Sequence, residues 1–286
     1  MVLAIGAALA GAVCCAVAAA LQHREAVSIR AAEAVGWRLL SALSRRPYWL
    51  AGVATLLVAT GLHSLALLNG PLSLVQPLGV TTVVFAVPVA AMVRRYRVRV
   101  WELLAAATVV TGLCGLLAIV PSQPASAGGA GSPPTAWMLA TATVLVVGVL
   151  TALASRRRVL LQGLLLATGA GIAMGVAAVL LQMVLLNAQR GGLLEVLSIA
   201  SGAVVLLAVA GVWLNQRAYR AGNVAVVLAV VTVSDPAAST ITAIVLGERL
   251  PTGVLSWLLL AISAATIVGG ITWLARSPAH AAGVPV

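Results

Sequence analysis

Long apolar runs, separated by short loops that carry arginine, dominate this chain of 286 residues. A helix needs about 20 apolar residues to cross the hydrocarbon core of a bilayer, and about nine runs approach that length. They are Val2–Leu21, Tyr48–Leu68, Pro71–Val93, Trp101–Val120, Ala136–Ala154, Leu161–Leu186, Leu193–Leu214, Asn223–Gly247 and Val254–Ala275. Backbone groups in lipid must be paired within the segment, so these runs predict helices. We expect an all-α, polytopic membrane helix bundle of about nine transmembrane helices.

The charged residues support this interpretation. Only 8% of the chain is charged, whereas a soluble domain carries about a quarter. All 17 basic residues are arginines in or beside the loops, and 15 of them share one side if the N-terminus is outside. Only Arg190 and Arg249 fall on the other side. Because inner loops are enriched in basic residues, we expect a cell-membrane protein with its N-terminus outside, its C-terminus cytoplasmic and no nucleic-acid partner.

Two halves of the chain are alike. The uncharged, Pro- and Gly-rich loop Ser122–Thr135 reads as a flexible linker between them. Beyond it, Leu164–Gln182 echoes Ala4–Gln22, which pairs the first four runs with the last four. The paired runs lie five spans apart and so have opposite orientations, as in the inverted repeats of secondary transporters. We expect a first repeat at 1–121, a linker and connecting span at 122–158, a second repeat of four spans at 159–276, and a cytoplasmic tail at 277–286.

The longest stretch between runs, Gln22–Pro47, has apolar residues at helical spacing with arginines between them. This pattern predicts an amphipathic helix that lies against the membrane surface on the cytoplasmic side. Membrane lipid is therefore an expected partner.

Asp235 is the candidate substrate-binding residue. It is the single aspartate of the chain and lies near the middle of the run Asn223–Gly247. A carboxyl at that depth is costly and normally faces a polar cavity or a partner. Pro236 follows it and should kink or open the helix. Thr232, Ser234, Ser239 and Thr240 would complete a polar patch. The alternative is that the carboxyl only fixes packing, while the hydroxyls bond to carbonyls of their own helix.

A second candidate region lies in Pro71–Val93, where Pro77 and Pro88 predict a broken helix that lines a cavity. Its substrate-binding candidates are Gln76, Thr81 and Thr82. The gate candidates near the outer ends of spans are His63, Gln182, Glu248 and Arg249. For each, a structural hydrogen bond or an exposed pair that ends a helix is the alternative.

Other acids have structural interpretations. Glu102 opens a helical run and should cap it, and Glu195 has the same interpretation. Gly171 and Gly175 offer a small-residue face for close helix packing. Cys14, Cys15 and Cys114 lie inside apolar runs without metal-ligand spacing. The sequence has no nucleophile–base pair, phosphate loop or metal cluster, so we expect neither an enzyme nor a cofactor.

Two stretches resemble a known family. AIVLGERLPTGVLSWLLLAISAATIVGG resembles the second repeat of the drug/metabolite transporter superfamily of the EamA type, and NGPLSLVQPLGVTTVVFA is similar to NIPA-type magnesium transporters, a branch of it. The resemblance implies two inverted repeats around a central substrate path. Its motifs fall on Gly247–Leu250 and Pro77–Gly79. The basic run Arg94–Arg97 replaces the acidic position expected in the first repeat, and full members have one more span.

Three functions are compatible with these features. The first is a carrier that moves a small organic solute by alternating access. The second is a magnesium transporter, in which Gln76, Thr81 and Ser234 would bind the waters of the hydrated ion. The third is a membrane scaffold or partner subunit that does not transport. A homodimer is compatible with each.

Overall fold

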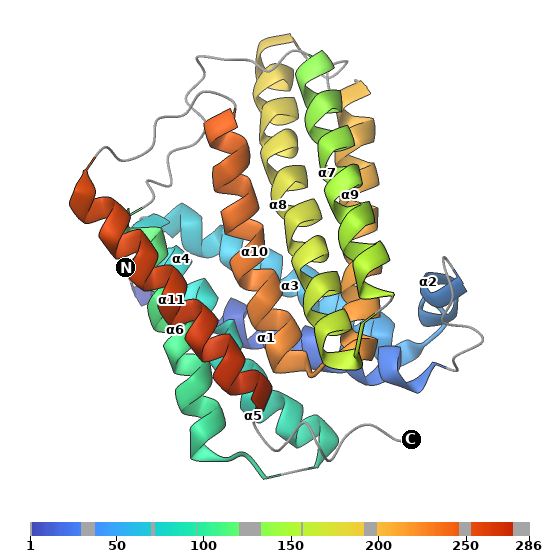
Figure 1. Ribbon diagram of the computed structural model, residues 1–286, viewed down its shortest axis with the longest axis vertical. Helices are drawn as coiled ribbons and strands as arrows, with labels where there is room; N and C mark the ends of the chain where they lie inside the picture. The colour runs from blue at the N-terminus through green and yellow to red at the C-terminus, as the bar shows by residue number, and fades with distance from the viewer. Residues whose placement is uncertain are drawn as a thin grey trace. The chain divides into compact units, whose positions relative to one another are not determined.

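The computed structural model describes residues 2–29, 38–69, 72–95, 97–119, 133–155, 157–191, 199–245 and 253–276. Every regular element in these ranges is an α-helix, as predicted (Figure 1). The helices are α1 (Val2–Ser28), α2 (Arg38–Leu43), α3 (Pro47–Asn69), α4 (Leu72–Val80), α5 (Thr82–Arg94), α6 (Val100–Ile119), α7 (Pro133–Ala154), α8 (Val159–Gly191), α9 (Ile199–Ala221), α10 (Val224–Val245) and α11 (Val254–Arg276).

Six helical segments within the described ranges are long and apolar enough to cross a membrane. They are Val2–Ser28, Pro47–Ala66, Val100–Ile119, Trp137–Ala154, Val159–Leu181 and Val254–Arg276. Two shorter apolar segments, Leu78–Val93 and Val224–Ser239, accompany them. Large apolar side chains such as Leu57 (70% exposed) and Leu258 (56%) lie on the surface, which suits lipid rather than water. The chain is therefore a multi-pass membrane protein.

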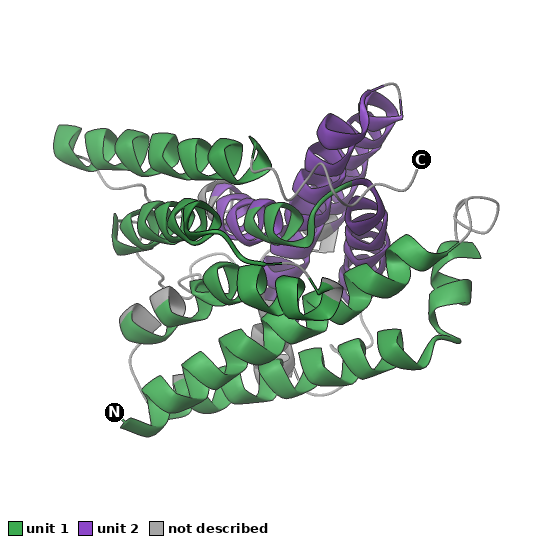
Figure 2. Ribbon diagram, turned by 90° about the horizontal axis from the view of Figure 1, so that it is seen from below, with its two compact units in different colours: residues 1–122, 222–229, 251–286 green, residues 123–221, 230–250 purple. Residues whose placement is uncertain are grey.

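The first compact unit comprises residues 1–122, 222–229 and 251–286 (Figure 2). Within it, α1 packs against α3, α4 and α5, and α6 packs against α11. Glycines allow the close approaches. A Cβ on Gly112 of α6 would lie 2.9 Å from the Ser263 carbonyl oxygen of α11, and one on Gly270 of α11 would lie 2.8 Å from the Val109 nitrogen of α6. Small residues let helix backbones approach closely where no hydrophobic force joins helices in lipid.

The second compact unit comprises residues 123–221 and 230–250. Helices α7, α8 and α9 contact one another and lie side by side (Figure 1). Leu180 of α8, Leu207 of α9 and Ala238 of α10 belong to its buried core. The two units are defined by which helices pack together, and α11 belongs with α6 in the first unit. The repeat boundaries at 121 and 159 concern sequence and topology, and they stay a prediction.

The predicted run Pro71–Val93 is interrupted, but not at a proline. Helix α4 contains Pro77 and ends at Val80, and α5 contains Pro88 without a break. The join is Thr81, whose backbone N–H donates to the Leu78 carbonyl at 3.2 Å, one residue closer than in an α-helix. Thr81 keeps right-handed helical angles (φ −58°, ψ −11°), so the interruption is a tightened turn rather than an extended loop.

Helix α10 is continuous from Val224 to Val245 and does not open at Pro236. The kink that we expected as the other outcome stays a prediction. A proline removes one backbone donor, and its ring clashes with the carbonyl four residues earlier, which can kink a helix without ending it. The segment 22–47 is only partly the predicted surface helix. Helix α1 continues through its first residues to Ser28, and the separate helix α2 begins at Arg38.

Candidate functional site

Asp235 lies on α10 where this helix crosses α8 in the second unit. Gly171 and Gly175, one turn apart on α8, face it. A Cβ on Gly171 would lie 2.5 Å from the Ser234 Cβ and 3.0 Å from the Asp235 nitrogen, and a Cβ on Gly175 would overlap the Asp235 carbonyl oxygen. Neither glycine could be alanine without moving a helix backbone. The predicted small-residue face of α8 therefore packs closely against another helix, and the contact lies at Asp235.

Ser239 connects the two helices one turn beyond Asp235. Its hydroxyl lies 3.1 Å from the Gly175 carbonyl oxygen on α8 and 3.0 Å from the Asp235 carbonyl oxygen on α10. The Asp235 carboxyl is a third hydrogen-bond partner. A hydroxyl has one proton to donate, so it serves one of these oxygens at a time and can accept from a fourth group. The serine is thus an adjustable hydrogen-bond partner for the acid.

Further oxygens surround this crossing. Pro236 supplies no N–H to the Thr232 carbonyl, which an α-helix would otherwise pair. Thr232, Ser234 and Asp235 are all half-buried rather than sealed. A carboxyl, two serine hydroxyls and a carbonyl that lacks its usual helical donor form a set that is rich in hydrogen-bond acceptors. Such a set can hold a proton, a cation or the donor group of a solute.

The candidates of the first unit have mainly structural partners. The Thr81 hydroxyl donates to the Leu78 carbonyl at 2.5 Å and the Thr82 hydroxyl to the Gly79 carbonyl at 2.6 Å. The His63 ring of α3 lies beside Gly79, with its Cε1 3.5 Å from the position that a Cβ would take. The threonines therefore pair carbonyls near the end of α4, as hydroxyls in helices often do.

Several other predicted residues lie outside what the structure describes. The backbones of Gln76 and Pro77 belong to α4 and that of Gln182 to α8, but their side chains are outside the described part. The described part also leaves out Glu195 and the whole motif Gly247–Leu250, which includes Glu248 and Arg249. Their roles stay predictions.

The cap predicted for Glu102 is present. The Glu102 carboxylate accepts a hydrogen bond from the Arg99 backbone N–H at 3.3 Å at the start of α6. Among the described residues, no group of three or more His, Cys, Asp or Glu side chains could hold a metal ion.

Sequence reasoning missed a polar group at the end of α1. Gln22, His23 and Glu25 are all buried, and His23 Nε2 lies 3.0 Å from the carbonyl oxygen of Gly222, two residues before α10. The signal was present, because these residues follow the first apolar run directly. We had interpreted them as the start of a surface helix.

Comparison of the chain with family models, curated proteins and solved structures found no match.

Proposed function

We propose that this chain is a secondary transporter of a small organic solute, with Asp235 as the group that meets the cargo or its coupling ion. The observation that carries the proposal is the position of this acid at the α8–α10 crossing. It lies in an apolar helix, far from either helix end, next to glycines that leave no room for side chains. An ionisable group in such a segment costs about 3 kcal/mol or more, and in membrane proteins it usually marks a substrate or ion path.

The finer architecture belongs to this proposal. It consists of nine spans, two inverted repeats of four, an outside N-terminus and a place in the drug/metabolite transporter superfamily. Its support is the sorting of the arginines, the echo between Leu164–Gln182 and Ala4–Gln22, and the quoted motifs. Alternating access would arise from rocking of one repeat against the other around the fixed acid.

A magnesium transporter is the second candidate, because the groups named above at the crossing are carboxyl, hydroxyl and carbonyl oxygens. Magnesium prefers carboxylate and water oxygens and keeps several waters when it binds. Asp235 would supply the charge, while Ser234 and Ser239 would contact the waters. One carboxyl is a small ligand set for this ion, so the solute carrier remains the main proposal.

Flux into proteoliposomes tests the proposal. The purified full chain is screened against radiolabelled cationic, neutral and anionic solutes and against magnesium. We expect flux of one class, which Asp235→Asn lowers by tenfold or more, a loss of about 1.4 kcal/mol in transition-state stabilisation. The matched control Glu102→Gln neutralises a helix-capping acid and should keep flux within about twofold.

Magnesium flux alone would select the second candidate. Flux that is equal in the wild type and Asp235→Asn would remove the acid from the mechanism. The absence of flux for every class would leave the scaffold alternative, provided that the reconstituted protein is folded.

A further inference from the structure

Helix α2 and the turn that follows it have buried leucines and exposed arginines. Leu39 and Leu43, one turn apart, are fully buried and pack against Ile29, with Trp49 at the edge of the cluster. Arg38, Ser41 and Arg45 of the same segment are exposed. The leucines therefore hold this short helix in place, with Arg38 at its start and Arg45 just after its end.

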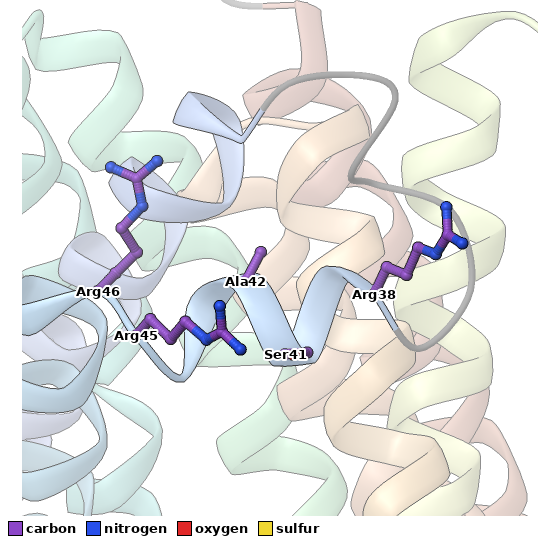
Figure 3. Close-up of a pocket in the computed structure, with 5 residues that line it drawn as sticks. All are labelled: Arg38, Ser41, Ala42, Arg45 and Arg46. Carbon is purple, nitrogen blue, oxygen red and sulfur yellow. The ribbon is translucent and has the colours of Figure 1, made fainter.

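A hollow of about 400 Å³ lies on the basic side of α2. Figure 3 shows Arg38 at one end of the helix and Arg45 and Arg46 beyond the other end, with Ala42 between them. The described residues that line the hollow are Arg38, Ser41, Ala42, Arg45 and Arg46. Its volume falls within the range of about 300–1,000 Å³ that is typical of sites for small ligands.

The three arginines have no acidic partner in the described part of this unit. The described acids there are Glu25 and Glu102; both are buried, and neither lines the hollow. A guanidinium has five N–H donors in a planar fork that matches phosphate oxygens and is weakly hydrated. Three such groups and a serine hydroxyl around one hollow suit a phosphate group.

The hollow lies next to the start of a candidate membrane span. The Arg46 backbone carbonyl oxygen accepts a hydrogen bond from the Leu50 backbone N–H at 3.0 Å. Arg46 therefore lies at the first turn of α3, whose candidate span begins at Pro47. Next to it, the guanidinium carbon of Arg24 lies 4.6 Å from the centre of the Tyr48 ring. Aromatic side chains and arginines at the ends of spans mark the headgroup region of the bilayer. A phosphate at this level belongs most directly to a lipid.

We propose that the hollow formed by Arg38, Ser41, Arg45 and Arg46 binds the phosphate headgroup of an anionic phospholipid. The bound lipid would join α2 to the start of α3 through its charge, while its acyl chains lie along the exposed apolar face of that helix. The site is separate from the α8–α10 crossing and does not depend on the transport proposal.

Thermal unfolding of the full chain in non-ionic detergent tests this site. Titration with short-chain phosphatidylglycerol should raise the unfolding midpoint, whereas short-chain phosphatidylcholine should not. The triple variant Arg38→Gln, Arg45→Gln and Arg46→Gln should need at least tenfold more phosphatidylglycerol for half the shift, because each arginine near an anionic headgroup contributes about fivefold. A matched triple variant, Arg157→Gln, Arg158→Gln and Arg276→Gln, removes three other exposed arginines and should respond like the wild type.

Three results would overturn the proposal. An equal loss in both triple variants would mean that only total charge attracts the lipid. An equal shift with inorganic phosphate at the same concentration would assign the hollow to a soluble anion. If the first triple variant fails to fold, Arg38→Gln alone, at an exposed position, is titrated instead, and a response identical to that of the wild type would count against the site.

Discussion

Glu102 and Asp235 are two carboxyls in apolar helices, one in each compact unit, and their surroundings differ. Glu102 lies in the first turn of α6, is 3% exposed, and accepts the Arg99 backbone N–H. An acid there pairs an otherwise unpaired donor and interacts favourably with the helix dipole. Asp235 lies in mid-helix, is half-buried, and has a serine and two glycines beside it. Neither end of α10 lies close enough to stabilise a charge on this carboxyl.

The comparison indicates that Glu102 stabilises the fold, whereas Asp235 does not. Removing Glu102 should cost stability and leave transport intact. Removing Asp235 should do the reverse, because functional groups are often placed where they do not stabilise the protein. The following substitutions test this contrast, from the largest expected effect on stability to the smallest.

Gly175→Ala should have the largest effect on stability. Its Cβ would overlap the Asp235 carbonyl oxygen, so α8 and α10 must move apart at the acid. Overpacking of this kind costs about 1–3 kcal/mol of unfolding free energy. Equilibrium unfolding in mixed detergent micelles measures it. The control Gly202→Ala on α9 has open space around its Cβ and should be neutral or stabilising; equal effects in both variants would contradict the close crossing.

Glu102→Ala should lower the unfolding free energy by about 1 kcal/mol, within the range of 0.5–2 kcal/mol for a lost cap. The Arg99 N–H would lose its acceptor. Glu102→Gln keeps an acceptor oxygen and should lose only the dipole term, about 0.3–1 kcal/mol. The same unfolding assay applies, with solute flux as a second readout. A larger loss for Gln than for Ala would show that capping is not the role of this residue.

Ser239→Ala should cost about 0.5–1.5 kcal/mol, the usual net value of a hydrogen bond. It removes the hydroxyl shared by Gly175 and Asp235 between α8 and α10. Ser64→Ala on α3 is the matched control, because that hydroxyl is exposed and bonds only back to its own helix, at Thr60. Indistinguishable unfolding curves for the two variants would exclude a stabilising bridge at Ser239.

Asp235→Asn should leave the unfolding free energy unchanged or raise it. The amide oxygen can still accept from Ser239, while an ionisable group is removed from an apolar helix. A fall of 1 kcal/mol or more, about what a lost net hydrogen bond costs, would place Asp235 with Glu102 among the structural acids.

The helices were predictable, but their crossings were not. The apolar runs predicted the starts of α1, α3, α6, α7, α8 and α11 within three residues, because length and apolarity decide such a helix, but α1 and α8 continue beyond their runs to Ser28 and Gly191. The Gly171–Gly175 pair was visible in the sequence, but nothing in it said that its partner would be α10 at Asp235. Which distant helices pack together depends on how their side chains fit, and this fit cannot be read from a single sequence.

The two proline-containing runs show the same limit. Pro77 and Pro236 look alike in sequence, yet one run is interrupted and the other is continuous. The interruption falls at Thr81, where the Thr81 and Thr82 hydroxyls donate hydrogen bonds to the Leu78 and Gly79 carbonyls of α4. At Pro236, α10 continues against the glycines of α8. The local hydrogen-bond partners, rather than the proline alone, determine whether the helix stops.

Access of water to residue 235 tests the central claim most directly, because a carboxyl that meets cargo must be reached from at least one side of the membrane. Asp235→Cys is placed in a chain whose Cys14, Cys15 and Cys114 are replaced by alanine, and a membrane-impermeant maleimide is added to either side of oriented vesicles. Ile241→Cys, an exposed apolar position on the same helix, and Arg157→Cys, in a loop, are the unreactive and reactive controls. We predict labelling at position 235 from at least one side; a cysteine there that stays unlabelled from both sides, while position 157 reacts, would contradict the account.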